Sequence, residues 1–152
     1  MLRTISIMAL VLGLVLSPAT ARAQNIYVTD NIAGTIGEYT TSGGTVNPSL
    51  VSGLSGPYGI AVSGSNLFVA NEVTGTIGEY TTSGGTVNPS LVSGLSGPYG
   101  IAVSGSNLFV TDYNDGTIGE YTTSGAVVNT SLISGLEDPS GIAVYGPNLF
   151  GG

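Results

Sequence analysis

Residues 34–69 read GTIGEYTTSGGTVNPSLVSGLSGPYGIAVSGSNLFV, and residues 75–110 repeat this stretch without a substitution. The offset from Gly34 to Gly75 is 41 residues, and a third copy from Gly116 differs mainly over residues 126–130 and 137–140. A tandem period of roughly 20–50 residues is typical of proteins in which each copy is one supersecondary unit. The period therefore decides the fold, and the identity of two copies indicates a recent duplication.

One repeat unit contains four short strand-like runs, at residues 59–62, 67–70, 76–82 and 86–92. The first run is small and apolar, the third is rich in β-branched and aromatic residues, and Gly, Asn and Ser occupy the turns. This spacing predicts strands that pair antiparallel, each with the next along the chain. Helices are not expected within the repeats, because a Gly or Pro occurs every few residues.

A four-stranded unit of about 40 residues has the size of one β-propeller blade. The alternative is a β-solenoid, although solenoid coils are usually shorter per turn. The predicted fold class is therefore all-β, a partial β-propeller built from a 41-residue tandem repeat. Within a blade, we expect residues 59–62 beside the central channel and residues 67–69 between blades. The third and fourth runs are expected to face outward.

The first 23 residues have the pattern of a secretory signal peptide. A basic start at Arg3 precedes an apolar helical run from Ile5 to Leu16, and small residues precede an expected cleavage after Ala23. The apolar run is shorter than the ~20 residues that span a bilayer, which argues against a membrane anchor. The expected domains are thus a signal helix over residues 1–23 and propeller repeats over residues 24–152. The expected location is secreted or periplasmic, in a bacterial envelope or outside the cell.

The charge of the chain after Ala23 is entirely negative. Both basic residues, Arg3 and Arg22, lie in the signal segment, so nine acidic residues give a formal charge of −9. Such a surface repels phosphate, and nucleic acids and anionic membranes are poor partners. We expect no membrane span after signal cleavage. The chain also has no Cys, so its stability must come from sheet packing and not from disulfides.

One block of the repeat resembles the repeat of a known family. The block Pro57–Val62 followed by Asn66–Asn71 resembles the NHL repeat, and the same block stands at residues 98–112. A weaker form occupies residues 139–150, and residues 25–30 resemble the second half of the block. The resemblance covers essentially the whole chain after the signal segment and implies an NHL-like β-propeller.

The number of blades is about three. In order, the chain supplies the last three strands of one blade, two complete four-stranded blades, a first strand near Pro139 and a stub at 148–150. Closed propellers need about four to eight blades, so an apolar face is expected at each end. Three explanations are open: a fragment of a longer gene, a homo-oligomer that completes the ring, or an open curved array.

No catalytic, cofactor-binding or metal-binding residues are predicted, and the chain is not expected to be an enzyme. Ile36 to Tyr39 is loosely similar to a strand of the streptogramin (virginiamycin B) lyases, which use a His and a metal-supported acid–base pair. This chain has no His. The lactonase-type propellers imply an asymmetric cluster of Glu, Asn and Asp ligands, and near-identical repeats do not offer one. An inactive or partial relative of these enzymes and a structural repeat array remain alternatives.

Two acidic features have competing interpretations. Residues 112–116 read DYNDG, which is either an oxygen-rich cation loop or a hairpin turn, and we favour the turn. Glu38, Glu79 and Glu120 occupy the same position in each blade. They could form a ring of carboxylates, although a solvated strand position is the simpler expectation.

Tyr58 and Tyr99 are the candidate ligand-face residues. Each follows a loop proline at the start of an inner strand, near the expected channel mouth. Their alternative role is packing of the turn between blades. The predicted function is a secreted binding or scaffold module, and its ligand is an unknown protein, a peptide or a carbohydrate that is neutral or cationic.

Overall fold

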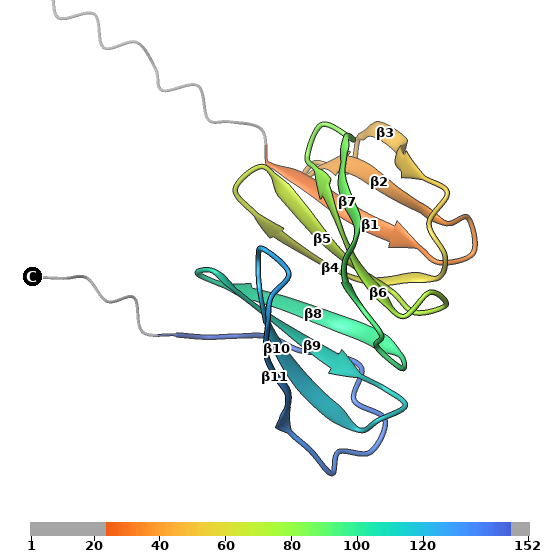
Figure 1. The fold of residues 1–152 in the computed structure, drawn as a ribbon. Coiled ribbons are helices and arrows are strands. Elements are labelled where there is room, and N and C mark those ends of the chain that lie inside the picture. Colours follow the sequence, from red (N-terminus) through yellow and green to blue (C-terminus); the bar gives the residue numbers. More distant parts are fainter. Residues whose placement is uncertain (1–23, 147–152) are drawn as a thin grey trace, which may run out of the picture.

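The computed structural model describes residues 24–146, and every regular element in this range is a β-strand (Figure 1). The predicted signal peptide of residues 1–23 and the predicted stub at residues 148–150 lie outside the described residues. The eleven strands are β1 (Asn25–Asp30), β2 (Thr35–Thr40), β3 (Thr45–Ser52), β4 (Pro57–Ser63), β5 (Asn66–Asn71), β6 (Thr76–Thr81), β7 (Thr86–Ser93), β8 (Pro98–Ser104), β9 (Asn107–Asp112), β10 (Thr117–Thr122) and β11 (Val127–Ile133).

The strands form three separate sheets with the orders β1-β2-β3, β4-β5-β6-β7 and β8-β9-β10-β11. We call these sheets the first, second and third blade. Each strand pairs antiparallel with the next one along the chain. The predicted up-and-down blades, two complete and one without its first strand, are therefore confirmed, and the solenoid alternative is wrong.

The turn between the second and third strand of each blade ends on a glycine with a left-handed backbone. The φ angles are 65° at Gly34, 62° at Gly75 and 63° at Gly116. Glycine adopts this conformation without the steric cost that a Cβ brings. The carbonyl of each of these glycines also accepts a hydrogen bond from the loop after the fourth strand, as in Leu95 N to Gly75 O at 3.0 Å. In each blade, one glycine therefore both forms the turn between the second and third strand and anchors the loop after the fourth strand.

The hydrophobic core lies between the blades, in two clusters. Between the first and second blade, Ile36 and Val51 pack against Leu67, Val69 and Tyr80. Between the second and third blade, a second cluster is formed by Ala61, Phe68, Ala70, Ile77, Val92, Ile101, Leu108, Val110 and Tyr121. Alternate residues of one strand thus serve opposite junctions, because successive side chains of a strand point to opposite faces. The prediction that residues 67–69 pack between blades is confirmed.

The expectation that the third strand faces outward is wrong. In the second blade, β6 is buried along most of its length, with Ile77 and Tyr80 in the two core clusters. In contrast, the fourth strands, such as β7, are mainly exposed. In this blade β6 is central because it is flanked by β5 and β7 in its own sheet and contributes to a core cluster on each face.

The expectation that the repeated glutamate of the third strand is solvated is also wrong. Glu79 is 9% exposed, and its Oε1 accepts a hydrogen bond of 2.7 Å from Asn66 Nδ2 on the neighbouring strand. The same bond joins Asn25 to Glu38 and Asn107 to Glu120. A buried carboxylate needs such a partner. The repeated Glu is therefore a structural link within each blade.

Residues 139–146 contain no strand, although the sequence predicts a first strand there. They nevertheless follow the path of an inner strand. A Cβ added to Gly59 would collide with the carbonyl of Tyr99, and one added to Gly100 would collide with the carbonyl of Ser140. The segment therefore lies against β8 as β8 lies against β4. Its partner in the repeat pattern, residues 148–150, lies outside the described range.

Among the described residues there is no helix with the length and hydrophobicity that a membrane crossing requires.

Candidate ligand-binding site

Three tyrosines form a row across the second and third blades. Tyr58 on β4 and Tyr99 on β8 are stacked, with ring centroids 4.1 Å apart and an angle of 22° between the rings. Tyr113, in the turn after β9, continues the row with a centroid 5.0 Å from that of Tyr99 and a tilt of 31°. We call these three residues the tyrosine row. All three side chains are partly exposed.

The repeat places the first two tyrosines. Pro57 and Pro98 are fully buried and begin the two inner strands, so the following Tyr in each blade has the same position. Gly59 comes next and has no Cβ, which lets β8 approach β4 closely. The short distance between the inner strands brings the two rings into stacking contact. The structure thus joins the two candidate residues and shows that they pack across the blade junction.

Neighbouring groups raise the pKa of two hydroxyls of the row, those of Tyr99 and Tyr113. Hydrogen bonding to the hydroxyl of Tyr58 raises the pKa of Tyr99 to about 12, and desolvation and the charge of Glu72 act in the same direction. Hydrogen bonding to Asp138, together with its charge, raises the pKa of Tyr113. Tyr99 and Tyr113 therefore stay protonated at physiological pH, and the carboxylates of Glu72 and Asp138 lie beside the row.

A hollow of about 330 Å³ adjoins the row. It is lined by the inner strands β4 and β8 and by residues 140–142, with Tyr58 and Tyr99 at its edge. Aromatic side chains at the edge of a concave site are common in ligand recognition. The arrangement can stack an apolar or cationic group of a ligand on a ring face. Polar atoms of the same ligand can then bond to the backbone of the inner strands.

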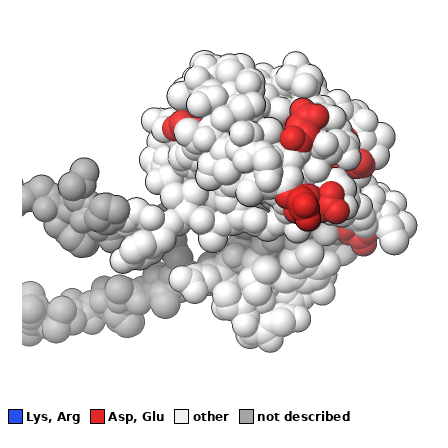
Figure 2. Space-filling model, turned by 90° about the horizontal axis from the view of Figure 1, so that it is seen from below, with Lys and Arg blue, Asp and Glu red and all other residues white. Residues whose placement is uncertain are grey.

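The surface around the site is uncharged or acidic. Residues 24–146 contain no Lys, Arg or His. Figure 2 shows one side of the molecule, on which acidic side chains form separate patches on a mainly uncharged surface. Any attractive long-range field therefore acts on cations.

The 112–116 segment is a hairpin turn between β9 and β10, as we favoured. The carboxylate of Asp112 is buried and accepts backbone N–H bonds from Ser96 at 2.9 Å and Gly97 at 2.8 Å. Its oxygens are thus used by the loop that leads into β8. Within residues 24–146, no three acidic side chains come together in a way that could hold a metal ion.

Sequence reasoning missed two members of the site, Tyr113 and Asp138. Tyr113 stands where the other repeats have Asn31 and Glu72, so the repeat pattern gave no reason to select it. The backbone bond from Tyr113 N to Gly97 O, 2.7 Å long, places this turn beside the loop that leads to Tyr99. The usable signal was that, at this position of the repeat, an aromatic residue occurs in the third blade alone.

Substitution Tyr58→Phe tests the link between the two stacked rings. It removes the hydroxyl and keeps the ring, so the pKa of Tyr99 should fall from about 12 towards its ordinary value of 10. Because the raised pKa belongs to the folded state, its contribution to stability is complete below pH 10 and is lost as the pH rises towards 12. Tyrosinate absorbance followed against pH measures the change. An unchanged high-pH step in the variant would show that the Tyr58 hydroxyl does not hold the Tyr99 proton.

Three separate antiparallel blades, two of four strands and one of three, with the inner strands β4 and β8 side by side, define the class: this is a β-propeller protein. The sequence matches no protein-family model and no curated protein. Solved structures, however, are similar. Virginiamycin B lyase from Staphylococcus aureus, as a catalytically inactive variant with quinupristin, superimposes with a TM-score of 0.64 and 26% identity. The match covers 78% of this chain and 41% of the lyase.

Two further structures share the fold. A chain of the nidogen–laminin complex has a TM-score of 0.65 and 23% identity, with 79% of this chain and 48% of that chain covered. The computationally designed Ika4 protein has a TM-score of 0.56 and 16% identity, with 86% and 85% covered. The predicted resemblance to NHL-like β-propellers is confirmed at the level of fold. This chain spans less than half the length of the lyase and of the nidogen–laminin chain.

Proposed function

We propose that this chain is an exported, non-catalytic propeller module that binds a cationic peptide segment of another protein through the tyrosine row. The stacked contact of Tyr58 and Tyr99 carries the proposal, because it presents aromatic faces beside a hollow. Glu72 and Asp138 add negative charge next to the rings. Aromatic faces with adjacent carboxylates suit Lys and Arg side chains, through cation–π contact and charge pairing.

A binding role is also supported by the chemistry that the chain does not have. The sequence contains no His and no Cys, and its basic residues are Arg3 and Arg22. General acid–base and nucleophilic mechanisms at neutral pH usually depend on such groups. The signal-like segment of residues 1–23 supports export to a secreted or periplasmic location.

The similarity to virginiamycin B lyase favours one second candidate, an inactive or partial relative of a propeller lyase. Both candidates predict that the purified chain does not degrade quinupristin. They differ because only the binding module predicts recognition of a basic peptide. Degradation of quinupristin by the chain would contradict both.

Substitution Tyr99→Ala is the test of the proposed function. The purified chain is titrated with an oligolysine peptide and, separately, with a neutral oligosaccharide, and binding is followed by calorimetry. We expect binding of the peptide, and a loss of about tenfold or more in affinity for the variant, because Tyr99 contacts both other rings.

The matched control is Tyr145→Ala, because Tyr145 is 97% exposed and lies outside the row. Its affinity should equal that of the unmodified chain. Binding of the oligosaccharide alone would replace the peptide by a carbohydrate as the ligand class. Equal losses for the two variants, or no binding at all, would overturn the proposal.

A further inference from the structure

The outer faces of the first and third blades repeat the surfaces that are buried inside the molecule. On the first blade, Val28 is 46% exposed, whereas its repeat counterpart Val69 is 0% exposed. On the third blade, Ile133 is 47% exposed, whereas its counterpart Val92 is 5% exposed. At both internal junctions, a face equivalent to that of Val28 packs against a face equivalent to that of Ile133. The two open faces are therefore complementary to each other in the same way.

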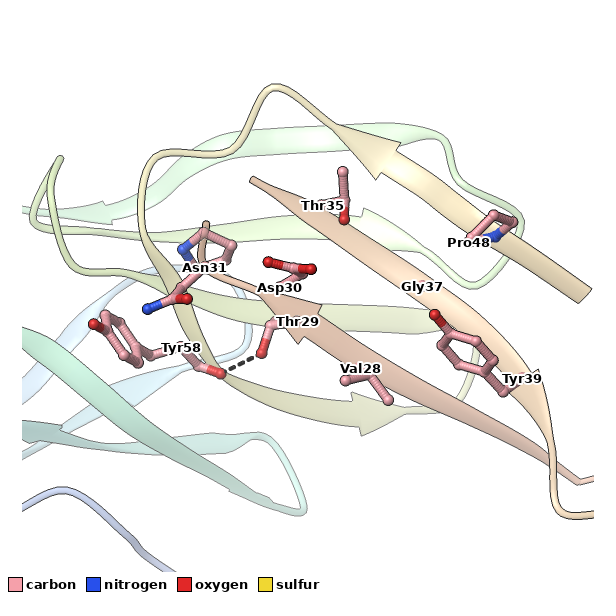
Figure 3. Close-up of a pocket in the computed structure, with 10 residues that line it drawn as sticks. Val28, Thr29, Asp30, Asn31, Thr35, Gly37, Tyr39, Pro48 and Tyr58 are labelled. Atoms are coloured by element: carbon pink, nitrogen blue, oxygen red, sulfur yellow. Dashed lines mark hydrogen bonds between the residues drawn. The ribbon is translucent and has the colours of Figure 1, made fainter. Parts of the chain in front are cut away.

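A pocket on the first blade shows what is missing from its outer face. Figure 3 shows this pocket of about 480 Å³, which is lined by residues that include Asp30, Tyr39 and Pro48. The equivalent site on the second blade is lined by Asn71, Tyr80 and Pro89 and measures about 170 Å³.

The internal sites include a leucine that the first-blade pocket lacks. In the second-blade site, Leu54 from the loop before β4 is part of the lining and packs against the core cluster at that junction. Leu95 has the same place at the next junction, where the site measures about 160 Å³. The next leucine in this series is Leu136, which is 37% exposed. By the repeat, a Leu136 side chain of a second copy would take the place at this pocket that Leu54 and Leu95 hold at the internal junctions.

Within residues 24–146, the first blade also has a strand edge without a partner. In the complete blades, an inner strand pairs with β5 or β9, but in this described part the equivalent strand β1 pairs only with β2. The segment 139–144 reads PSGIAV and matches the inner strands PYGIAV at 57–62 and 98–103. Among the described residues, this segment has no strand partner, and the edge of β1 that faces away from β2 has none either.

We propose that residues 139–144 of one copy of this chain add to the edge of β1 in a second copy, and that the outer faces of the third and first blades close around this strand. The register follows from the pairs that already exist. Ile60 pairs with Val69 and Val62 pairs with Leu67. Shifted by the repeat, Ile142 pairs with Val28, and Val144 pairs with Ile26.

The occupant is a second copy because the chain itself contains both halves of the junction, each present twice in buried form. Strand addition to an exposed edge is an established mode of recognition, in which backbone bonds supply affinity and side-chain pockets supply specificity. A head-to-tail contact of this kind forms a ring when the rotation closes. Two copies contribute about six blades, within the range of about four to eight at which propellers close.

Disulfide trapping tests the register, because the chain has no Cys of its own. The pair of Val144 and Ile26 copies the pair next to a two-residue turn, a non-hydrogen-bonded position with Cα atoms about 4.5 Å apart, which suits a disulfide. The chain with Val144→Cys and Ile26→Cys should become a covalent dimer on mild oxidation. The control carries Val144→Cys and Val87→Cys, and Val87 is an exposed residue of β7.

The mass of the unlinked chain in solution tests the assembly, at high salt so that the negative charges of the copies are screened. Light scattering should give twice the chain mass, Val28→Glu should return the mass to that of one chain, and Val87→Glu should leave it doubled. A chain that stays monomeric at high concentration, with no specific cross-link, would overturn the proposal, as would equal cross-linking of the control. Cross-linking keeps the test decisive if Val28→Glu does not fold. Peptide binding at the tyrosine row is a separate measurement, so either proposal can fail alone.

Discussion

Substitution Phe68→Ala is expected to lower the free energy of unfolding by about 3–5 kcal/mol. Phe68 is 1% exposed and belongs to the core cluster between the second and third blades. Its removal leaves a cavity at a junction where the surrounding strands are held by their own sheets and cannot collapse to fill it. Urea denaturation followed by circular dichroism measures the loss.

The repeat supplies a control of identical chemistry. Phe109 is the counterpart of Phe68 one blade further on, but it is only partly buried because no blade covers its face. Phe109→Ala should cost about 1–2 kcal/mol when measured at a dilution at which copies do not associate. Equal losses for the two variants would mean that the blades are not stacked in the order observed.

The comparison of Phe68 with Phe109 also shows what a repeat sequence can reveal. The period, the four runs and the turn residues were enough to predict antiparallel blades, because local patterns fix strand and turn positions. The same pattern gave identical expectations for identical residues. Burial, however, depends on whether a neighbouring blade covers the residue, and this is a property of its place in the array.

The repeated Glu illustrates a second limit. Glu79 was expected to be solvated, since carboxylates are rarely buried without a partner. Its partner, Asn66, is 13 positions away in sequence and becomes a neighbour only through the pairing of β5 with β6. The repeat shows that the two residues always occur together, but strand register is needed to show that they touch. The same reason hid Tyr113, whose contact with Tyr99 depends on two loops from different strands.

The candidate site was therefore only partly predictable. Tyr58 and Tyr99 were found because they follow a proline at the start of an inner strand, which is a local signal. Their stacking distance of 4.1 Å arises from the close approach of β4 and β8 at Gly59. That approach is a consequence of blade packing, and a single repeat does not contain it.

Substitution Gly75→Ala is expected to destabilise the chain by about 3–4 kcal/mol, close to the effect of Phe68→Ala. Two costs act together. The φ angle of 62° is unfavourable for a residue with a Cβ, and the added Cβ would collide with the carbonyl of Leu95. The collision falls on a loop that is also tied to Gly75 by the bond from Leu95 N to Gly75 O, so the loop cannot move away without losing that bond. The loss is measured by urea denaturation.

Gly64→Ala separates the two costs. Gly64 has a φ angle of 59°, nearly that of Gly75, but a Cβ there meets no atom within 4 Å. Its substitution should therefore show the backbone cost alone, about 1–2 kcal/mol. The difference between the two variants isolates the contact between the turn and the loop that returns the chain to the next inner strand. If both variants lose the same amount, that contact does not stabilise the blade, and the glycine at each turn is required only for its backbone conformation.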